Sequence, residues 1–73
     1  MKTSDFYLAA YLLDKGFELQ GSDRSNPKRI FFHFDSGENE AIVFFNKEAV
    51  VEPISFSMSI KYLKKELYKY DKD

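Results

Sequence analysis

The stretch SGENEAIVFFNKEAVVEP, residues 36–53, decides between two folds for this chain. Its centre, AIVFF, is rich in the β-branched and aromatic residues that favour strands. Yet Ala41, Phe44 and Phe45 also follow the i, i+3, i+4 spacing of a helix that begins within SGENE. A run of this length is too short for periodicity to separate strand from helix, so both interpretations stay open on the pattern alone.

Upstream of this stretch, the pattern predicts a helix that starts at Thr3–Asp5, whose side chains suit helix N-termini, and runs to about Lys15. Gly16 then ends it, because glycine takes the left-handed conformation at little cost. Its apolar side is formed by Phe6, Leu8, Ala9, Ala10, Leu12 and Leu13. Tyr7 and Tyr11, four residues apart, fall on the opposite, polar arc, which turns them from the main apolar stripe; helical geometry alone leaves their exposure open.

A β-hairpin is predicted after this helix. The segments FELQGSD (17–23) and KRIFFHFD (28–35) alternate apolar and polar residues, and the polar turn DRSNP connects them. The residues expected to face the core are Phe17, Leu19, Ile30, Phe32 and Phe34. Phe31 and His33 are then expected on the opposite, outer face of the hairpin.

Downstream of the ambiguous stretch, Pro53 suits the first position of a long helix, which we expect to end at about Tyr70, before a frayed DKD tail. One apolar stripe, with steps of four and three residues, is formed by Phe56, Ile60, Leu63, Leu67 and Tyr70. The reverse face is expected to carry Lys61, Lys65, Lys69 and Lys72.

Motifs along nearly the whole chain resemble a small domain-of-unknown-function family from bacteria, archaea and their phages. The resemblance rests on TSDFYLAAYLLDKGFEL, RIFFHFD and FFNKEAVVEPISFSMSIKYLKKELY. The family's short helix ends in an aromatic residue and Asn, here Phe45 and Asn46, which implies a helix over about Glu38–Phe45. Lys47 stands where the family often has glycine. The family brings no established activity, and its occurrence in phages is consistent with an accessory role.

We therefore expect one small α+β domain over residues 1–73, ordered as helix, β-hairpin, short helix and longer C-terminal helix. The alternative is a three-stranded antiparallel meander between two helices, if residues 41–45 form a strand. Ala49–Val51 is a candidate for a short additional edge strand.

Composition argues against several classes of function. The chain has no Cys, which excludes disulfides, zinc thiolates and thiol nucleophiles. It has one histidine, His33, near Asp35 but without a nucleophile, and no phosphate loop or hydrolase motif. We expect no enzyme, no cofactor and no metal. Since no signal-peptide pattern and no apolar run near the ~20 residues that span a bilayer is present, we expect a cytoplasmic protein without membrane contact.

We expect a small non-enzymatic interaction module, an accessory protein of a phage or prokaryote, that binds another macromolecule. A protein partner or a second copy would contact Tyr7 and Tyr11, or Phe31 and the hairpin tip, because aromatic residues are enriched at interface hot spots.

The alternative is a nucleic-acid-binding module. Arg24, Lys28 and Arg29 cluster at the hairpin tip, where they would hold phosphate while bases stack on Phe31 and His33. The lysines of the last helix would add charge. The net charge of −1 and five acids between residues 35 and 52 oppose phosphate binding, so this alternative stays second.

Overall fold

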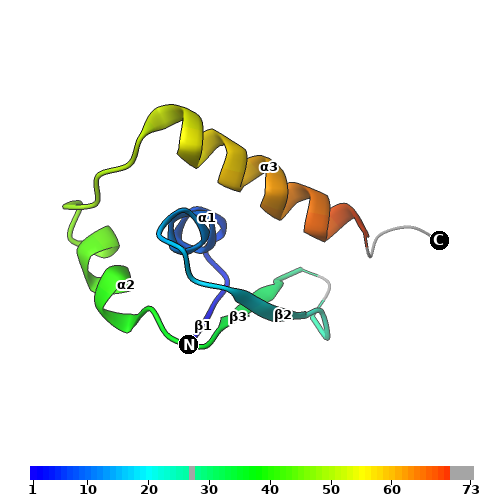
Figure 1. Cartoon of the computed structure of the whole chain (residues 1–73). Helices are drawn as coiled ribbons and strands as arrows, with labels where there is room; N and C mark the ends of the chain where they lie inside the picture. Colours follow the sequence, from blue (N-terminus) through cyan, green and yellow to red (C-terminus); the bar gives the residue numbers. More distant parts are fainter. Residues whose placement is uncertain (27, 70–73) are drawn as a thin grey trace.

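The structure is a computed structural model, and it describes residues 1–26 and 28–69. In chain order its elements are β1 (Lys2–Thr3), α1 (Phe6–Asp14), β2 (Leu19–Asp23), β3 (Phe31–Phe34), α2 (Glu38–Phe45) and α3 (Pro53–Lys69). Over the described residues the fold is α+β, with three helices and a three-stranded antiparallel sheet (Figure 1). The predicted order of helix, hairpin, short helix and long helix is confirmed.

The ambiguous stretch, residues 36–53, contains a helix. Residues 38–45 form α2, as the family resemblance implied, so the meander alternative is wrong. The helix starts after Gly37, whose φ of 126° suits glycine, and Glu38 and Glu40 lie in its first turn, where acids complement the helix dipole. The helix ends at Asn46 and Lys47, and Lys47 has a φ of 62°. Lys47 therefore adopts the left-handed backbone that favours glycine.

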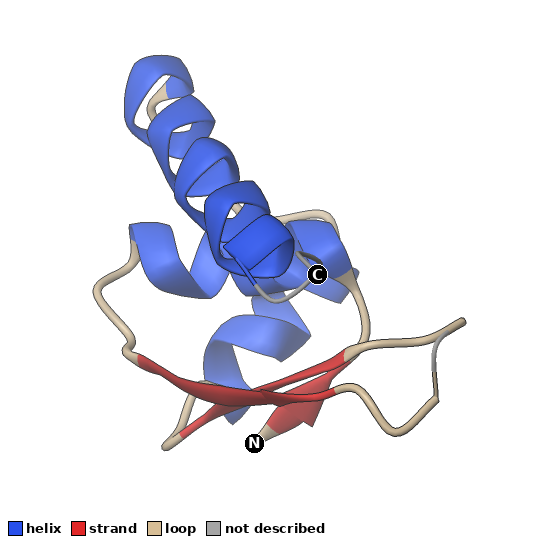
Figure 2. Ribbon diagram, turned by 90° about the vertical axis from the view of Figure 1, so that its right-hand side faces the viewer, coloured by secondary structure: helices blue, strands red, loops and turns tan. Residues whose placement is uncertain are grey.

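Helix α1 is the centre of the core. It lies between the sheet and α3 in both views of the chain (Figure 1, Figure 2). Asp5 caps it, because its carboxylate accepts a hydrogen bond from the Leu8 N–H over 3.0 Å. The buried core consists of Leu8, Ala9, Ala10, Tyr11, Leu12, Phe32, Phe34 and Leu63. The two alanines of α1 are fully buried, so their small side chains suit a helix packed from opposite sides.

The sheet has the order β1-β3-β2. Lys2 pairs with His33 and Thr3 with Phe32, so an N-terminal strand that the sequence pattern did not predict covers one edge of β3. Ala49–Val51, the candidate edge strand, is not in the sheet. On the other side, β2 pairs with β3 across a bulge between Leu19 and Gly21.

Tyr11, a candidate contact residue on the polar arc of α1, is buried, which corrects its place in an exposed binding surface. Its side chain is 4% exposed, because α2 packs against the side of α1 that the helical wheel left polar. The rings of Tyr11 and Phe44 lie with their centroids 5.6 Å apart, and the Lys15 ammonium lies 5.4 Å from the Tyr11 ring centroid. Tyr7, by contrast, is exposed.

Helix α3 packs on α1 through the predicted apolar stripe, where Leu63 is buried and Phe56, Ile60 and Leu67 are half-buried. The prediction for Tyr70, that for Lys72 and the DKD tail lie outside the described residues. The Glu52 carboxylate accepts hydrogen bonds from the N–H groups of Ile54 and Ser55, which closes the start of the helix.

Candidate functional site

The outward side of α3 carries exposed apolar side chains between lysines. The five residues of this stripe follow steps of four, three, four and three, opposite the buried stripe: Ile54, Met58, Lys61, Lys65 and Tyr68. Met58 and Tyr68 are each 64% exposed, and Tyr62 borders the stripe at 50% exposure. These six residues are called the outer face of α3 below.

The outer face of α3 is not flat. A shallow groove of about 530 Å³ is lined by Met58, Tyr62 and Tyr68 together with three lysines, Lys61, Lys64 and Lys65. The apolar side chains supply its walls, and the lysines place positive charge along it. A groove of this kind offers apolar contact with a positive rim, a combination that fits a partner surface which is apolar and acidic.

The sequence interpretation missed the apolar part of this face. It assigned only lysines to the side of the last helix opposite the predicted buried stripe. Ile54, Met58 and Tyr62 do not belong to that buried stripe, so they were left out. The signal was nevertheless present: ISFSMSIKYL has large apolar residues on both sides of the helix, more than one buried stripe requires.

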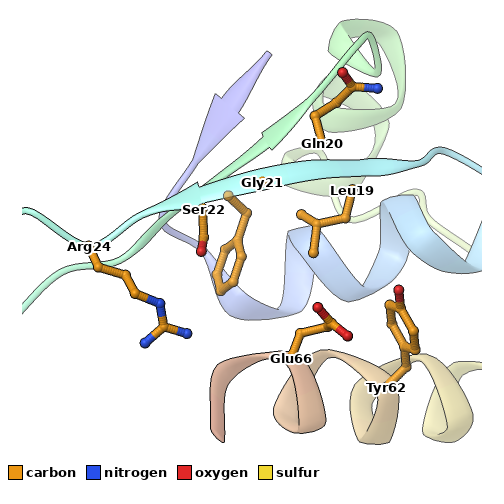
Figure 3. Close-up of a pocket in the computed structure, with 8 residues that line it drawn as sticks. Leu19, Gln20, Gly21, Ser22, Arg24, Tyr62 and Glu66 are labelled. Atoms are coloured by element: carbon orange, nitrogen blue, oxygen red, sulfur yellow. The ribbon is translucent and has the colours of Figure 1, made fainter. Parts of the chain in front are cut away.

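A second, smaller hollow of about 150 Å³ lies between β2 and α3. Figure 3 shows Tyr62 and Glu66 pointing from α3 toward β2, with Arg24 entering from the hairpin. The hollow is also lined by Leu19, Gln20, Gly21, Ser22 and Phe32. Tyr62 therefore has one side on this hollow and the other on the outer face of α3.

The structure separates Arg24 from the other basic residues of the hairpin tip. Its Nη2 donates a hydrogen bond to the Leu67 carbonyl of α3 over 2.9 Å, and its side chain is half-buried. The expected basic cluster of Arg24, Lys28 and Arg29 is thus corrected to the exposed pair Lys28 and Arg29. Arg24 turns inward because the Leu67 carbonyl of α3 accepts this hydrogen bond.

On the outer face of the sheet, the Phe31 ring lies close to two positively charged side chains. The Lys2 ammonium lies 5.3 Å from the Phe31 ring centroid and the Arg29 guanidinium carbon 5.9 Å from it. His33 is half-buried and pairs with Lys2 in the register. Arg29, Phe31 and His33 therefore share a face, as predicted, but Phe31 is already contacted by two positive side chains.

Asp23 adds a negative charge to the same face, since it pairs with Phe31 in the register. Its pKa is lowered from the ordinary value chiefly by the hydrogen bond from the Ser25 backbone N–H, then by that from the Ser25 hydroxyl, with Lys2 and His33 adding to the effect. Within residues 1–26 and 28–69, no three histidine, aspartate or glutamate side chains are grouped so as to hold a metal ion. No helix of the described chain is both long and apolar enough to cross a bilayer.

Comparison with known proteins identifies one protein family, described as "Domain of unknown function (DUF5659)", whose model matches residues 1–69. The resemblance drawn from the sequence motifs, to a domain-of-unknown-function family, is confirmed. No curated protein and no solved structure matches the chain.

Proposed function

Because the chain belongs to the DUF5659 family, which carries no known activity, we propose a function from its own surfaces: it is a small non-enzymatic interaction module that binds a partner protein through the outer face of α3. The observation that supports this proposal is the row of exposed apolar side chains on a helix that already buries its other side. Soluble monomeric domains seldom expose clustered large apolar side chains unless something binds there.

The residue types support a protein as the ligand. Tyrosine and methionine are enriched at interfaces, where they give large contact areas. Lys61 and Lys65 lie within the same stripe as Met58, so a partner must meet positive charge and apolar surface together. A partner surface that combines apolar side chains with carboxylates meets both requirements.

The test compares two variants for binding. Met58→Ser/Tyr68→Ser removes apolar contact from the outer face of α3, while Tyr7→Ser removes an equally exposed aromatic side chain on α1. Tagged wild-type protein and each variant are incubated with lysate of the native host, and retained proteins are quantified by mass spectrometry. A discrete acidic protein retained by wild type and Tyr7→Ser, but lost with the double variant, is the expected result. Equal retention by the double variant would overturn the proposal.

Nucleic-acid binding is the second candidate, and the cluster of Lys2, Arg29 and Phe31 on the outer sheet face favours it. Binding through this face would be measured by fluorescence anisotropy with a labelled single-stranded oligonucleotide. Affinity that falls steeply between low and moderate salt, and again in Lys28→Ala/Arg29→Ala, would support it. Asp23 on the same face, together with the net charge of −1, places it behind protein binding.

A further inference from the structure

Helix α2 also carries an exposed stripe, and its charge is opposite to that of α3. Glu38, Ile42 and Phe45 follow steps of four and three residues, so they lie along one side of α2. Ile42 is 59% exposed and Phe45 61% exposed. These three residues are called the outer stripe of α2 below.

The chain therefore has two exposed apolar surfaces of unlike charge. The negative charge on the outer stripe of α2 is the carboxylate of Glu38, which lies within a segment, residues 35–52, of five acids (Asp35, Glu38, Glu40, Glu48 and Glu52) and one base, Lys47. The outer face of α3 presents Lys61 and Lys65, with Lys64 beside them on the same groove. Pairing either surface with itself would bring like charges together, whereas pairing one with the other brings opposite charges together.

We infer that the outer face of α3 binds a second copy of this chain through the outer stripe of α2. This inference rests on the proposed function, because it names the partner of the same α3 surface. Ile42 and Phe45 of one copy enter the groove between Met58, Tyr62 and Tyr68 of the next. Glu38 then lies near the lysines of that groove.

The carboxylate of Glu38 is accessible for this contact. Its only ion pair among the described residues is with the Met1 amino group at 3.9 Å, and the Glu38 side chain remains 69% exposed. Because the contact joins two different surfaces, it repeats from copy to copy as a ring or an open chain, or closes as a reciprocal pair when both contacts form at once.

The first measurement is sedimentation velocity of the purified chain over a range of concentrations, at low and at moderate salt. The expected result is assembly that grows with concentration and weakens with salt, since exposed charge pairs are screened. A chain that stays monomeric at every concentration overturns the inference.

Charge reversal then identifies the surfaces. Lys61→Glu/Lys65→Glu reverses the charge of the outer face of α3. Glu38→Lys/Asn39→Lys reverses the charge at the outer stripe of α2, where Asn39 is the exposed neighbour of Glu38. Each variant alone is expected to associate about tenfold or more weakly, because like charges then meet. An equimolar mixture of the two is expected to regain assembly, because each reversed surface finds an opposite one.

The matched control for Lys61→Glu/Lys65→Glu is Lys28→Glu/Arg29→Glu, which lowers the net charge by the same amount at the exposed hairpin tip. It should assemble like wild type. Circular dichroism of each variant confirms that it is folded. Assembly that persists in both reversed variants, or a mixture that stays monomeric, overturns the inference. If the chain is monomeric while Met58→Ser/Tyr68→Ser still loses a lysate protein, the second copy is excluded and the proposed function stands.

Discussion

The Nη2 of Arg24 donates a hydrogen bond to the carbonyl of Leu67 over 2.9 Å, and this contact ties the hairpin tip to the end of α3. The two residues are 43 positions apart in the chain. Because the guanidinium is charged, its hydrogen bond to a carbonyl is stronger than one between two neutral groups. The residue that the sequence placed in a phosphate-binding tip therefore holds the sheet and the last helix together.

Arg24→Ala should lower the free energy of unfolding by about 1.5–3 kcal/mol, the range for hydrogen bonds to charged groups. Lys28→Ala, at the exposed part of the same tip, should change it by less than about 0.5 kcal/mol. Urea unfolding followed by circular dichroism measures both. Equal stability of the two variants would contradict a structural role for Arg24.

Tyr11→Ala should lower the free energy of unfolding by about 3–5 kcal/mol, as for other buried aromatic residues, because it leaves a cavity between α1 and Phe44. Tyr7→Ala should stay within about 0.5 kcal/mol of wild type, since that side chain is exposed. Tyr11→Phe keeps the ring and should remain folded, which allows the comparison even if the alanine variant is unfolded. Thermal melts of the three variants show whether the two tyrosines differ in this way.

Gly37→Ala and Gly16→Ala separate a steric clash from backbone strain. Both glycines have positive φ, 126° and 97°, but an alanine Cβ at residue 37 would lie 2.8 Å from Leu12 Cδ2, whereas at residue 16 it would meet open space. Gly16→Ala should cost about 1–2 kcal/mol from strain alone. Gly37→Ala should lower the free energy of unfolding by clearly more than Gly16→Ala. If urea unfolding shows a smaller loss for Gly37→Ala, this would contradict the close packing of α2 on α1.

Lys47→Gly should stabilise the chain. Lys47 has a φ of 62°, a conformation that costs a residue with a Cβ about 1–2 kcal/mol. Glycine removes this cost but loses more freedom on folding, so a net gain of about 0.5–1 kcal/mol is expected. Lys47→Ala keeps the Cβ and serves as the control for loss of the lysine side chain, and it should show no such gain in the same unfolding assay.

Asp23 should contribute a pH-dependent part of the stability. Its pKa in the folded chain is lowered, first by the Ser25 backbone N–H and then by the Ser25 hydroxyl. A lowered folded pKa means that the stabilisation is present above the ordinary aspartate pKa of about 3.9 and is lost as the pH falls through the folded pKa. The stability difference between wild type and Asp23→Asn should thus shrink from pH 6 to pH 2.5.

Local sequence signals predicted most of the fold, because caps, glycines and periodicity act over a few residues. Asp5, Gly16 and Pro53 marked helix boundaries, and Phe32 and Phe34 the inner face of the sheet. Strand β1 was missed because two residues carry no periodic signal. It exists only because β3, far along the chain, supplies its hydrogen bonds.

The candidate site was harder to predict for the same reason. Whether a helix side is exposed depends on what later parts of the chain place on it. Tyr11 is covered because Phe44 arrives from α2, whereas Met58 is exposed because none of the described elements covers that side of α3. A helical wheel records the spacing of side chains within one helix and contains no information about its neighbours.

The pairing of β1 with β3 also determines the order in which the chain can fold during synthesis. Lys2 meets His33 across about thirty residues of chain, so β1 stays without its partner during synthesis until β3 has emerged. Helix α1 can form earlier from local contacts, but the sheet cannot. Translation therefore produces the edge of the sheet first, and folding completes it only after the hairpin exists.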